Sequence, residues 1–327
     1  MNVREQEALN MSPASDRLVE PIGDRPWPRP ELPIGLGTNT FGRTMDEGQS
    51  CQVLDFFVEA GGTLVDTADT YSNGESEVII GRWMRERGTR EQVTLVSKVG
   101  NHADFDGLSA KSVAGGLESS LRRLSTDSID IYFAHYEDRT VPVAESAAAF
   151  DAAFRAGKIR AVGLSNFAAA TIDEWLDVAR SGGLEAPVVL QPHYSLSQRQ
   201  PYESEVAGIA AAEGLMVLPY RALGGGFLTG KYRTTADTQG RARGAGVLPL
   251  LTPAGLRLLD TLDAIARTHD VRPAAIALAW LLQQPTVTAP LASATSTTQL
   301  AELLAAPTVR MDDSDLDRLT AAADSLV

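Results

Sequence analysis

The stretch TLVDTADTY at residues 63–71 contains a short apolar, β-branched run that ends in a carboxylate and is soon followed by a tyrosine. A similar run at residues 93–98, VTLVSK, ends in a lysine, and another at residues 129–135, IDIYFAH, ends in a histidine. In α/β folds the carboxyl ends of parallel strands carry the chemistry. We therefore expect the polar residues that follow these runs to meet at one edge of a parallel sheet. They are Asp66, Tyr71, Lys98 and His135.

Around these runs, strand-like segments alternate with amphipathic helical segments from Ile34 to the C-terminus. Most of the strand-like segments are continuous apolar runs, as expected for strands that are covered on both faces. They begin near Ile34, Thr63, Val93, Ile129, Ile159, Val188, Leu215 and Val287. Eight such units predict an α/β protein with a single (β/α)8 barrel, the TIM-barrel architecture, and extra helices at its C-terminal end.

A doubly wound sheet is the alternative arrangement of the same elements. Its nucleotide-binding form carries a G-x-G-x-x-G motif between the first strand and the first helix. Gly35, Gly37 and Gly42 do not have that spacing, and no linker interrupts the alternation. The barrel is therefore favoured. The longest irregular stretch, residues 224–252, follows the seventh strand, and loops of that length are often functional.

The composition restricts the class of protein and its partners. The chain has 327 residues and a net charge of −13, from 29 Lys plus Arg against 42 Asp plus Glu. This acidic balance argues against a nucleic-acid-binding or anionic-membrane surface, and no apolar stretch is long enough to span a membrane. The lone Cys51 excludes a disulfide framework and fits the cytoplasm. Residues 1–30 are rich in proline and charge, which predicts a flexible or loosely docked arm before a catalytic barrel domain at residues 31–327.

The four polar residues at the strand ends together have the chemistry of a proton donor with supporting groups. Tyr71 alone is a poor acid at neutral pH, since a tyrosine has a pKa near 10. The ammonium of Lys98 is expected to lower that pKa, and Asp66 is expected to keep the lysine charged. His135 is expected to share or relay the proton and to orient a carbonyl oxygen. Each of these residues alone is more often structural than catalytic, but four of them on three successive strand ends favour a catalytic site.

Longer motifs extend these runs along most of the chain, from about Leu32 onward. They are DTADTYSNGESEVIIGRWM, LVSKVG, IDIYFAHYED, GKIRAVGLSNF, VLQPHYSLSQRQ, LPYRALGGGFLTGKYR and APLASATSTTQLAELL. In this order the motifs resemble the aldo-keto reductases, and GGFLTGKY resembles the bacterial members related to potassium-channel β-subunits. The resemblance implies a barrel enzyme that reduces an aldehyde or a ketone to an alcohol with a nicotinamide cofactor. Tyr71 would be the general acid/base, and Asp66, Lys98 and His135 would complete the tetrad.

The resemblance also implies where the cofactor, NADP with NAD as the alternative, would bind. Amide and hydroxyl groups would hold the nicotinamide carboxamide, an aromatic ring would stack on the nicotinamide, and a glycine loop would approach the pyrophosphate. The residues at these positions are Thr38, Asn39, Asp66, Ser165, Asn166, Gln191, Tyr220, Arg221, Leu223, Gly225, Lys231, Arg241, Thr295 and Gln299. The candidates for the substrate pocket, besides Asn39, are Phe41, Trp83, Tyr136 and Phe167.

Two departures from the family pattern leave the choice between NADP and NAD open. Residues 293–298 contain no lysine or arginine for an adenosine 2′-phosphate, and Leu303 stands where an asparagine is usual for the adenine. Arg221 stands where serine is common, and it could hold phosphate or reach the substrate. Two alternative functions therefore stay open: an NAD-dependent sugar or alcohol dehydrogenase, and a cofactor-sensing regulatory subunit with vestigial turnover.

Other chemistries are less compatible with the sequence. Residues 225–231, GGFLTGK, come close to a phosphate-binding P-loop, but Tyr232 replaces the hydroxyl residue that would bind Mg²⁺. No metal site is predicted, because the histidines and the cysteine lack ligand spacing. These residues are His102, His135, His193, His269 and Cys51. The expected partner is a small carbonyl compound, and the oligomeric state stays open.

Overall fold

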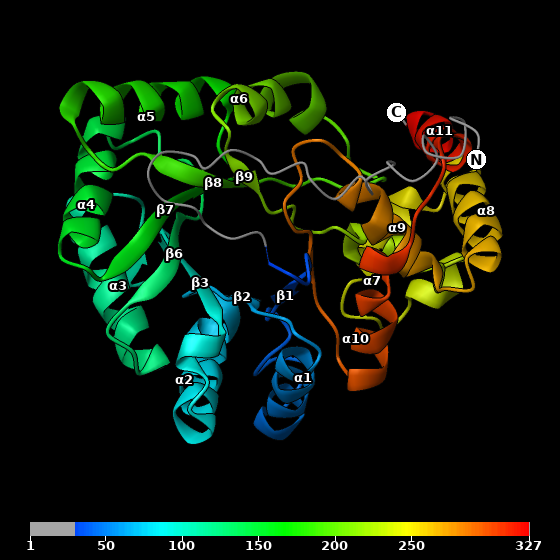
Figure 1. Cartoon of the computed structure of the whole chain (residues 1–327), viewed down its shortest axis with the longest axis horizontal. Coiled ribbons are helices and arrows are strands. Elements are labelled where there is room, and N and C mark those ends of the chain that lie inside the picture. The colour runs from blue at the N-terminus through cyan, green and yellow to red at the C-terminus, as the bar shows by residue number, and fades with distance from the viewer. Residues whose placement is uncertain (1–29, 327) are drawn as a thin grey trace, which may run out of the picture.

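A computed structural model describes residues 30–326 of the chain. The predicted arm at residues 1–30 lies outside the described residues, apart from its last residue. The described part forms an eight-stranded, entirely parallel sheet that curls on itself, with helices around it (Figure 1). The strand order is β10-β1-β2-β3-β6-β7-β8-β9. The strands are β1 (Gly35–Gly37), β2 (Leu64–Asp66), β3 (Thr94–Val99), β6 (Ile129–Ala134), β7 (Ile159–Ser165), β8 (Pro187–Gln191), β9 (Met216–Val217) and β10 (Leu291–Ala292).

The two ends of this sheet meet between β9 and the segment that leads into β10. The backbone N–H of Thr288 donates to the carbonyl oxygen of Val217 at 2.9 Å, and the N–H of Leu291 donates to that of Pro219 at 2.8 Å. These bonds close the sheet into a barrel, which leaves no strand edge open to pairing with another chain. The predicted (β/α)8 barrel is confirmed, and each of the eight predicted strands is present.

Helices follow the strands and cover the outside of the barrel (Figure 1). Their bounds are α1 (Glu47–Glu59), α2 (Glu75–Arg87), α3 (Ala110–Leu124), α4 (Val143–Arg155), α5 (Ala169–Gly182), α6 (Ala207–Ala212), α7 (Gly244–Val247), α8 (Pro253–Thr268), α9 (Pro273–Leu282), α10 (Thr297–Leu304) and α11 (Asp313–Asp324). Local sequence fixes their ends. The side chain of Thr252 caps α8 while Pro253 takes its first position, and Gly183 ends α5 in the left-handed region. None of the helices in residues 30–326 is long and apolar enough to cross a membrane.

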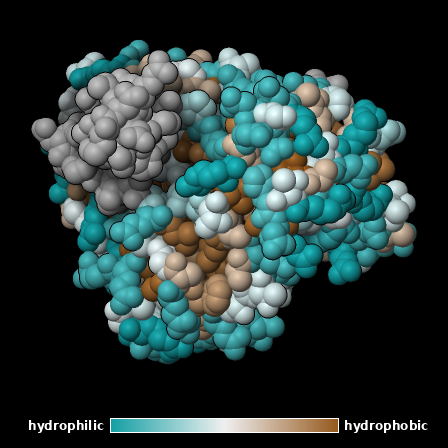
Figure 2. Space-filling model, turned by 45° about the vertical axis from the view of Figure 1, so that its right-hand side comes forward, coloured by the Kyte–Doolittle hydropathy of each residue, from teal (hydrophilic) through white to brown (hydrophobic). Residues whose placement is uncertain are grey.

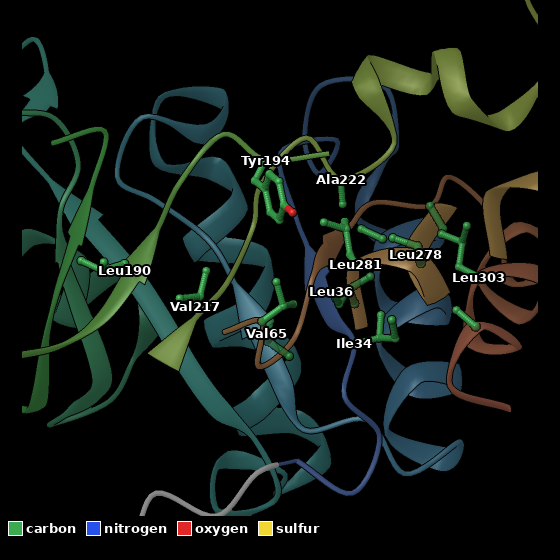
Figure 3. Packing of buried hydrophobic residues seen from close by; sticks show 14 of the residues in the cluster. Ile34, Leu36, Val65, Leu190, Tyr194, Val217, Ala222, Leu278, Leu281 and Leu303 are labelled. Atoms are coloured by element: carbon green, nitrogen blue, oxygen red, sulfur yellow. The ribbon is translucent and has the colours of Figure 1, made fainter. Parts of the chain in front are cut away.

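Apolar side chains pack in two places, inside the barrel and between the barrel and its helices. The outer cluster joins strand residues such as Leu36 and Val65 to Leu278 and Leu281 of α9 and Leu303 of α10, which point toward one another (Figure 3). The surface in Figure 2 is largely hydrophilic, with apolar residues showing together near the centre of that face. The interior is filled so closely that a Cβ on the inward-facing Gly163 would lie 2.4 Å from the ring of Phe133.

Two segments differ from the sequence-based prediction. A hairpin of β4 (Asn101–His102) and β5 (Phe105–Asp106) extends from the end of β3, and its two-residue strands are too short to show a hydrophobic period. Residues 224–252 were expected to be irregular, but they form a series of short helical turns. These are Gly224–Thr229, Thr235–Thr238, α7 and Leu248–Leu250. Turns of three to six residues bury too few side chains to leave a periodic pattern.

Candidate active site

The polar residues at the strand ends continue the rows of side chains that fill the barrel interior. Successive side chains of a strand point to opposite faces, so residues two apart point the same way. Five strands, and the residue directly after β9, place apolar side chains inside the barrel, at Leu64, Val96, Phe133, Val189, Leu218 and Leu291. Two positions further along the same segments are Asp66, Lys98, His135, Gln191, Tyr220 and Ser293. The barrel therefore has an apolar interior closed at its carboxyl end by a polar tier, because the alternation is unbroken between the two.

Lys98 and Asp66 form a buried ion pair within this tier. The ammonium of Lys98 donates to Asp66 Oδ2 at 2.8 Å and to the carbonyl oxygen of Thr67 at 2.6 Å. Gln191 Nε2 donates to the same Asp66 oxygen at 2.8 Å. Burial lowers the pKa of Lys98, while Asp66 opposes that decrease and favours the charged form. The carboxylate thus has two donors, and the buried ammonium has two acceptors, as a buried charge requires.

Tyr71 begins a tight turn, Tyr71–Gly74, directly after β2. Its ring centroid lies 5.1 Å from the Lys98 ammonium and 6.4 Å from the His135 ring, which it meets edge-on. Removal from water raises the pKa of Tyr71 well above its usual value, and the negative charge of Asp66 adds to the increase. The lowering expected from Lys98 therefore does not prevail, since burial favours the neutral phenol. The phenol keeps its proton at neutral pH.

His135 is uncharged in this environment. Burial, and then the charge of Lys98, lowers its pKa from 6.5 to about 3. Its Nδ1 atom is buried and has no hydrogen-bond partner. The exposed ring of Tyr136 stacks on the imidazole with a centroid distance of 4.8 Å. A neutral imidazole beside a neutral phenol can offer hydrogen bonds to a carbonyl oxygen without adding a charge.

A second group of polar side chains forms the adjoining wall. Asn166 adopts a left-handed backbone conformation with φ of 60°, which asparagine tolerates better than most residues. Its side-chain nitrogen donates to the carbonyl oxygen of His135 at 2.9 Å, and its oxygen accepts a hydrogen bond from the hydroxyl of Tyr220 at 2.6 Å. Ser165 Oγ donates to the carbonyl oxygen of Gln191 at 2.9 Å. Amide groups and a flat ring are thus fixed around one space.

Both walls face a cavity of about 1320 Å³. Most of the predicted site residues line it, and Lys98 lies directly behind, fully buried. The predicted residues in the lining are Asn39, Asp66, Tyr71, His135, Tyr136, Ser165, Asn166, Gln191, Tyr220, Arg221, Leu223, Gly225, Lys231 and Gln299. Gly224, Gly225 and Gly226 all have positive φ, which lets the loop after β9 expose its backbone to the cavity.

Some predicted residues lie outside the lining of this cavity. Trp83 is buried between helices, where its indole N–H donates to Asp55 at 2.7 Å. Phe41 is fully buried, and Phe167 packs edge-on against Trp175. Neither Phe41 nor Phe167 lines the cavity. Thr38, Arg241 and Thr295 are absent from the lining as well.

The cavity also contains residues that the sequence-based reasoning did not single out for the site. Arg243 lines the cavity whereas Arg241 does not, and Arg243 Nη2 donates to Asn39 Oδ1 at 3.0 Å. Arg43, His193, Arg272 and Ser293 line the cavity too. Ser293 could have been found from the alternation, because it lies two residues after the inward-facing Leu291. The arginines stand in loops or beside helix ends, where no period exists to follow.

A further buried polar group lies behind the tetrad. Asp69 is fully buried, and neither of its carboxyl oxygens has a hydrogen-bond partner. Glu77 is also fully buried, and it accepts hydrogen bonds from Arg123 at 2.7 Å and from Ser97 at 2.5 Å. Burial and the charge of Glu77 raise the pKa of Asp69 from 3.8 to about 7. Within residues 30–326, no three His, Cys, Asp or Glu side chains are grouped so that they could hold a metal ion.

Comparison with known proteins places the chain among relatives of similar length. Residues 33–324 match the sequence model of the aldo/keto reductase family. The protein tas of Escherichia coli strain K12 is 33% identical over 302 residues, which cover 82% of this chain and 87% of that protein. Aldo-keto reductase YhdN of Bacillus subtilis strain 168 is 34% identical over 77% of this chain and 78% of its own length. A probable voltage-gated potassium channel subunit beta of Oryza sativa subsp. japonica is 33% identical, covering 80% of this chain and 83% of that subunit.

Proposed function

Because this chain belongs to the aldo/keto reductase family, we propose that it reduces an aldehyde or a ketone to an alcohol with NADPH, and that Tyr71 donates the proton. The observation that carries the proposal is the position of Tyr71, which lies beside the buried Lys98–Asp66 pair and lines the cavity. A group that donates a proton has to hold it at the working pH, and burial raises the pKa of Tyr71, which favours the protonated phenol.

Support for a nicotinamide cofactor comes from the donor set on the other wall. The amide groups of Asn166 and Gln191 and the hydroxyl of Ser165 suit a carboxamide, and the ring of Tyr220 suits a flat heterocycle. The glycine loop has Lys231 at its end and offers backbone N–H groups and a cation for a pyrophosphate. When bound, the cofactor supplies the hydride for the carbonyl carbon.

The side chains of the tetrad and Gln191 would stabilise the carbonyl oxygen and transfer the proton. Tyr71 and the neutral His135 can donate hydrogen bonds to the carbonyl oxygen, where negative charge develops during reduction. Proton transfer leaves a phenolate on Tyr71, and the Lys98 ammonium, 5.1 Å from that ring, stabilises it. Gln191 donates a hydrogen bond to the Asp66 carboxylate, which in turn accepts one from Lys98. These two bonds keep the Lys98 ammonium in place during proton transfer.

For the preference of NADP over NAD, the relevant residue is Arg272. It lines the cavity near Gln299, and its Nε lies 3.2 Å from Glu302 Oε1. We propose that Arg272 provides the cation for a 2′-phosphate that residues 293–298 lack. The carboxylate of Glu302 favours the alternative, an NAD-dependent dehydrogenase, since a carboxylate suits a free ribose hydroxyl. Arg272→Gln should raise the dissociation constant of NADPH about tenfold relative to that of NADH. An unchanged ratio of the two constants would favour NAD.

The reductase proposal is tested with Tyr71→Phe. The variant should lose turnover of NADPH with a panel of aldehydes by about a hundredfold or more, while the dissociation constant of NADPH, measured by fluorescence, stays the same. Tyr202→Phe is the matched control, because Tyr202 is buried away from the cavity and its hydroxyl meets only Thr286. Normal turnover by Tyr71→Phe would exclude this proton donor. A wild-type protein that binds NADPH but oxidises it with no carbonyl compound would instead favour a cofactor-sensing subunit.

A further inference from the structure

Guanidinium groups gather at the mouth of the cavity on the side of Tyr71. Arg43 follows β1, Arg221 follows β9, and Arg243 directly precedes α7; all three line the same cavity. The hydrogen bond from Arg243 to Asn39 holds that guanidinium near the end of β1. The charge of Arg243 opposes the rise in the pKa of Tyr71 in part. Burial is the main cause of the lowered pKa of Arg243, and the charges of Arg43 and Arg221 add to that decrease.

No carboxylate of residues 30–326 pairs with these three arginines. Pairing is common elsewhere in the chain, where Arg233 contacts both Asp260 and Asp263. The chain also carries more acidic than basic residues, 42 against 29, so carboxylates are abundant. Grouping like charges without a counter-ion is unfavourable. An anion that binds in the cavity would supply the missing partner.

The position of Arg43 separates this anion from the phosphates of the proposed cofactor. The loop that carries Arg43 is attached to the turn of the proton donor, because Ser72 Oγ donates to the carbonyl oxygen of Phe41 at 2.6 Å. A Cβ on Gly42 would likewise lie 2.6 Å from the side chain of Glu75. The amide wall and the glycine loop that would hold the cofactor belong to β7, β8 and the segment after β9. Arg43 therefore extends the arginine group beyond that segment, to the side of the cavity from which a substrate would meet the proton donor.

The backbone conformation of Arg221 is a second indication that its side chain binds a ligand. Arg221 has φ of 52°, a left-handed conformation that is unfavourable for a long side chain. Its backbone carbonyl accepts a hydrogen bond from Gly224 at 2.7 Å, which is part of the turn that opens the glycine loop. Such strain collects at ligand sites more often than elsewhere. His193 stacks on Tyr220 in the same wall and stays neutral, since burial and Arg221 lower its pKa to about 4.

We propose that the substrate is a carbonyl compound that carries an anionic oxygen group, a carboxylate or a phosphate, and that Arg43 and Arg243 bind this group with Arg221 beside them. The planar guanidinium matches either group with paired hydrogen bonds. The inference rests on the proposed reductase function and adds to it the class of substrate. The three arginines act as specificity-determining residues, since they hold the substrate and take no part in hydride or proton transfer.

The test compares substrates that differ only in charge. One pair is 4-carboxybenzaldehyde and its methyl ester, and the other is glyceraldehyde 3-phosphate and glyceraldehyde. The wild-type enzyme should show a kcat/KM with NADPH that is about tenfold or more higher for an anionic member, mainly through KM. Arg43→Gln should reduce that ratio toward one, and Arg43→Lys should keep part of it. Arg85→Gln, on the exposed side of α2, is the control that should leave both values unchanged.

Several results would overturn the inference. One is a neutral member of each pair that is turned over as well as, or better than, its anionic counterpart. Another is an Arg43→Gln variant that keeps the ratio but weakens NADPH binding, which would assign the arginines to the cofactor. If no carbonyl compound is turned over, the reductase proposal fails. Binding measured by calorimetry then still shows whether the arginines bind an anionic group. The wild type with NADP⁺ should then bind 4-(hydroxymethyl)benzoate more tightly than its methyl ester, and Arg43→Gln should not.

Discussion

Replacing Asp69 by asparagine is expected to stabilise the protein at alkaline pH and to have a small opposite effect at acidic pH. The carboxyl group of Asp69 is fully buried, and neither oxygen has a hydrogen-bond partner. Burial is the larger cause of the raised pKa, and the buried carboxylate of Glu77 is the second; Arg123 and the backbone of Thr70 oppose them only in part. The charge of ionised Asp69 is therefore only partly compensated inside the fold.

The direction of the pH effect follows from proton binding. The pKa of Asp69 is raised from 3.8 to about 7 on folding, so the folded state binds more protons between these values. The free energy of unfolding then falls as pH rises through this window and stays constant above it. A difference of roughly three pKa units corresponds to about 4 kcal/mol, as an upper bound. The amide of Asp69→Asn cannot ionise but lacks a partner, which costs about 1 kcal/mol, so the net gain at about pH 8 is about 3 kcal/mol.

Thermal unfolding of the wild type and of Asp69→Asn at about pH 3.5, below the unfolded pKa, and at about pH 8 measures this effect. At the higher pH the variant should melt at least about 5 °C above the wild type, and at the lower pH slightly below it. Asp127→Asn, at an exposed position, is the matched control and should show no such pH dependence. Equal shifts of the melting temperature at both pH values would refute the reasoning, because the effect could not then come from the ionisation of Asp69.

Three further perturbations have defined outcomes. Lys98→Met leaves Asp66 buried without its ion-pair partner and should lower the free energy of unfolding in urea by about 3 kcal/mol; a loss below about 1 kcal/mol would contradict the buried pair. Trp83→Phe removes the hydrogen bond to Asp55 and should lower that free energy by about 1 kcal/mol, with no change in KM for any carbonyl compound; a changed KM would contradict its place between the helices. His135, with its pKa lowered from 6.5 to about 3, should show no ring titration by NMR between about pH 5 and pH 8, and its contribution to stability should be lost as pH falls below about 6.5. An NMR midpoint near pH 6.5 would show that the imidazole is not desolvated.

The strands and the inward-facing site residues were predictable because one physical rule governs both. A strand buried on both faces reads as an apolar run, and its end is visible where a polar residue follows. The alternation then fixes which polar residue shares a face with the interior. That is why Lys98 and His135 could be named from VTLVSK and IDIYFAH. Fold and site were predicted together, since the same side-chain period sets them both.

Residues off the strands were harder to place, because nearness in sequence to a motif does not fix a direction in space. Trp83 lies on α2, and Ile79 precedes it by one helical turn, so an apolar stripe at helical spacing already indicated packing against a neighbouring element. Arg241 and Arg243 lie two residues apart in a loop that has no hydrophobic period, so the sequence does not show which of them faces the cavity. Tertiary contacts place Arg243 beside Asn39. The effect of burial on the pKa of Tyr71 could not be predicted either, because the sequence shows which charged residues are near Tyr71 but not how far its side chain is removed from water.

The unbroken alternation from the barrel interior to the polar tier has a consequence for how this enzyme can change. Inserting or deleting one residue inside β2 or β3 would turn Asp66 or Lys98 to the outer face and, at the same time, leave a hole where Leu64 or Val96 had been. Such a change would reduce both the stability of the fold and the activity of the site. Insertions and deletions in related chains should therefore be confined to the segments after the strands. Grafting those segments from a relative should then transfer substrate choice while the reaction itself is retained.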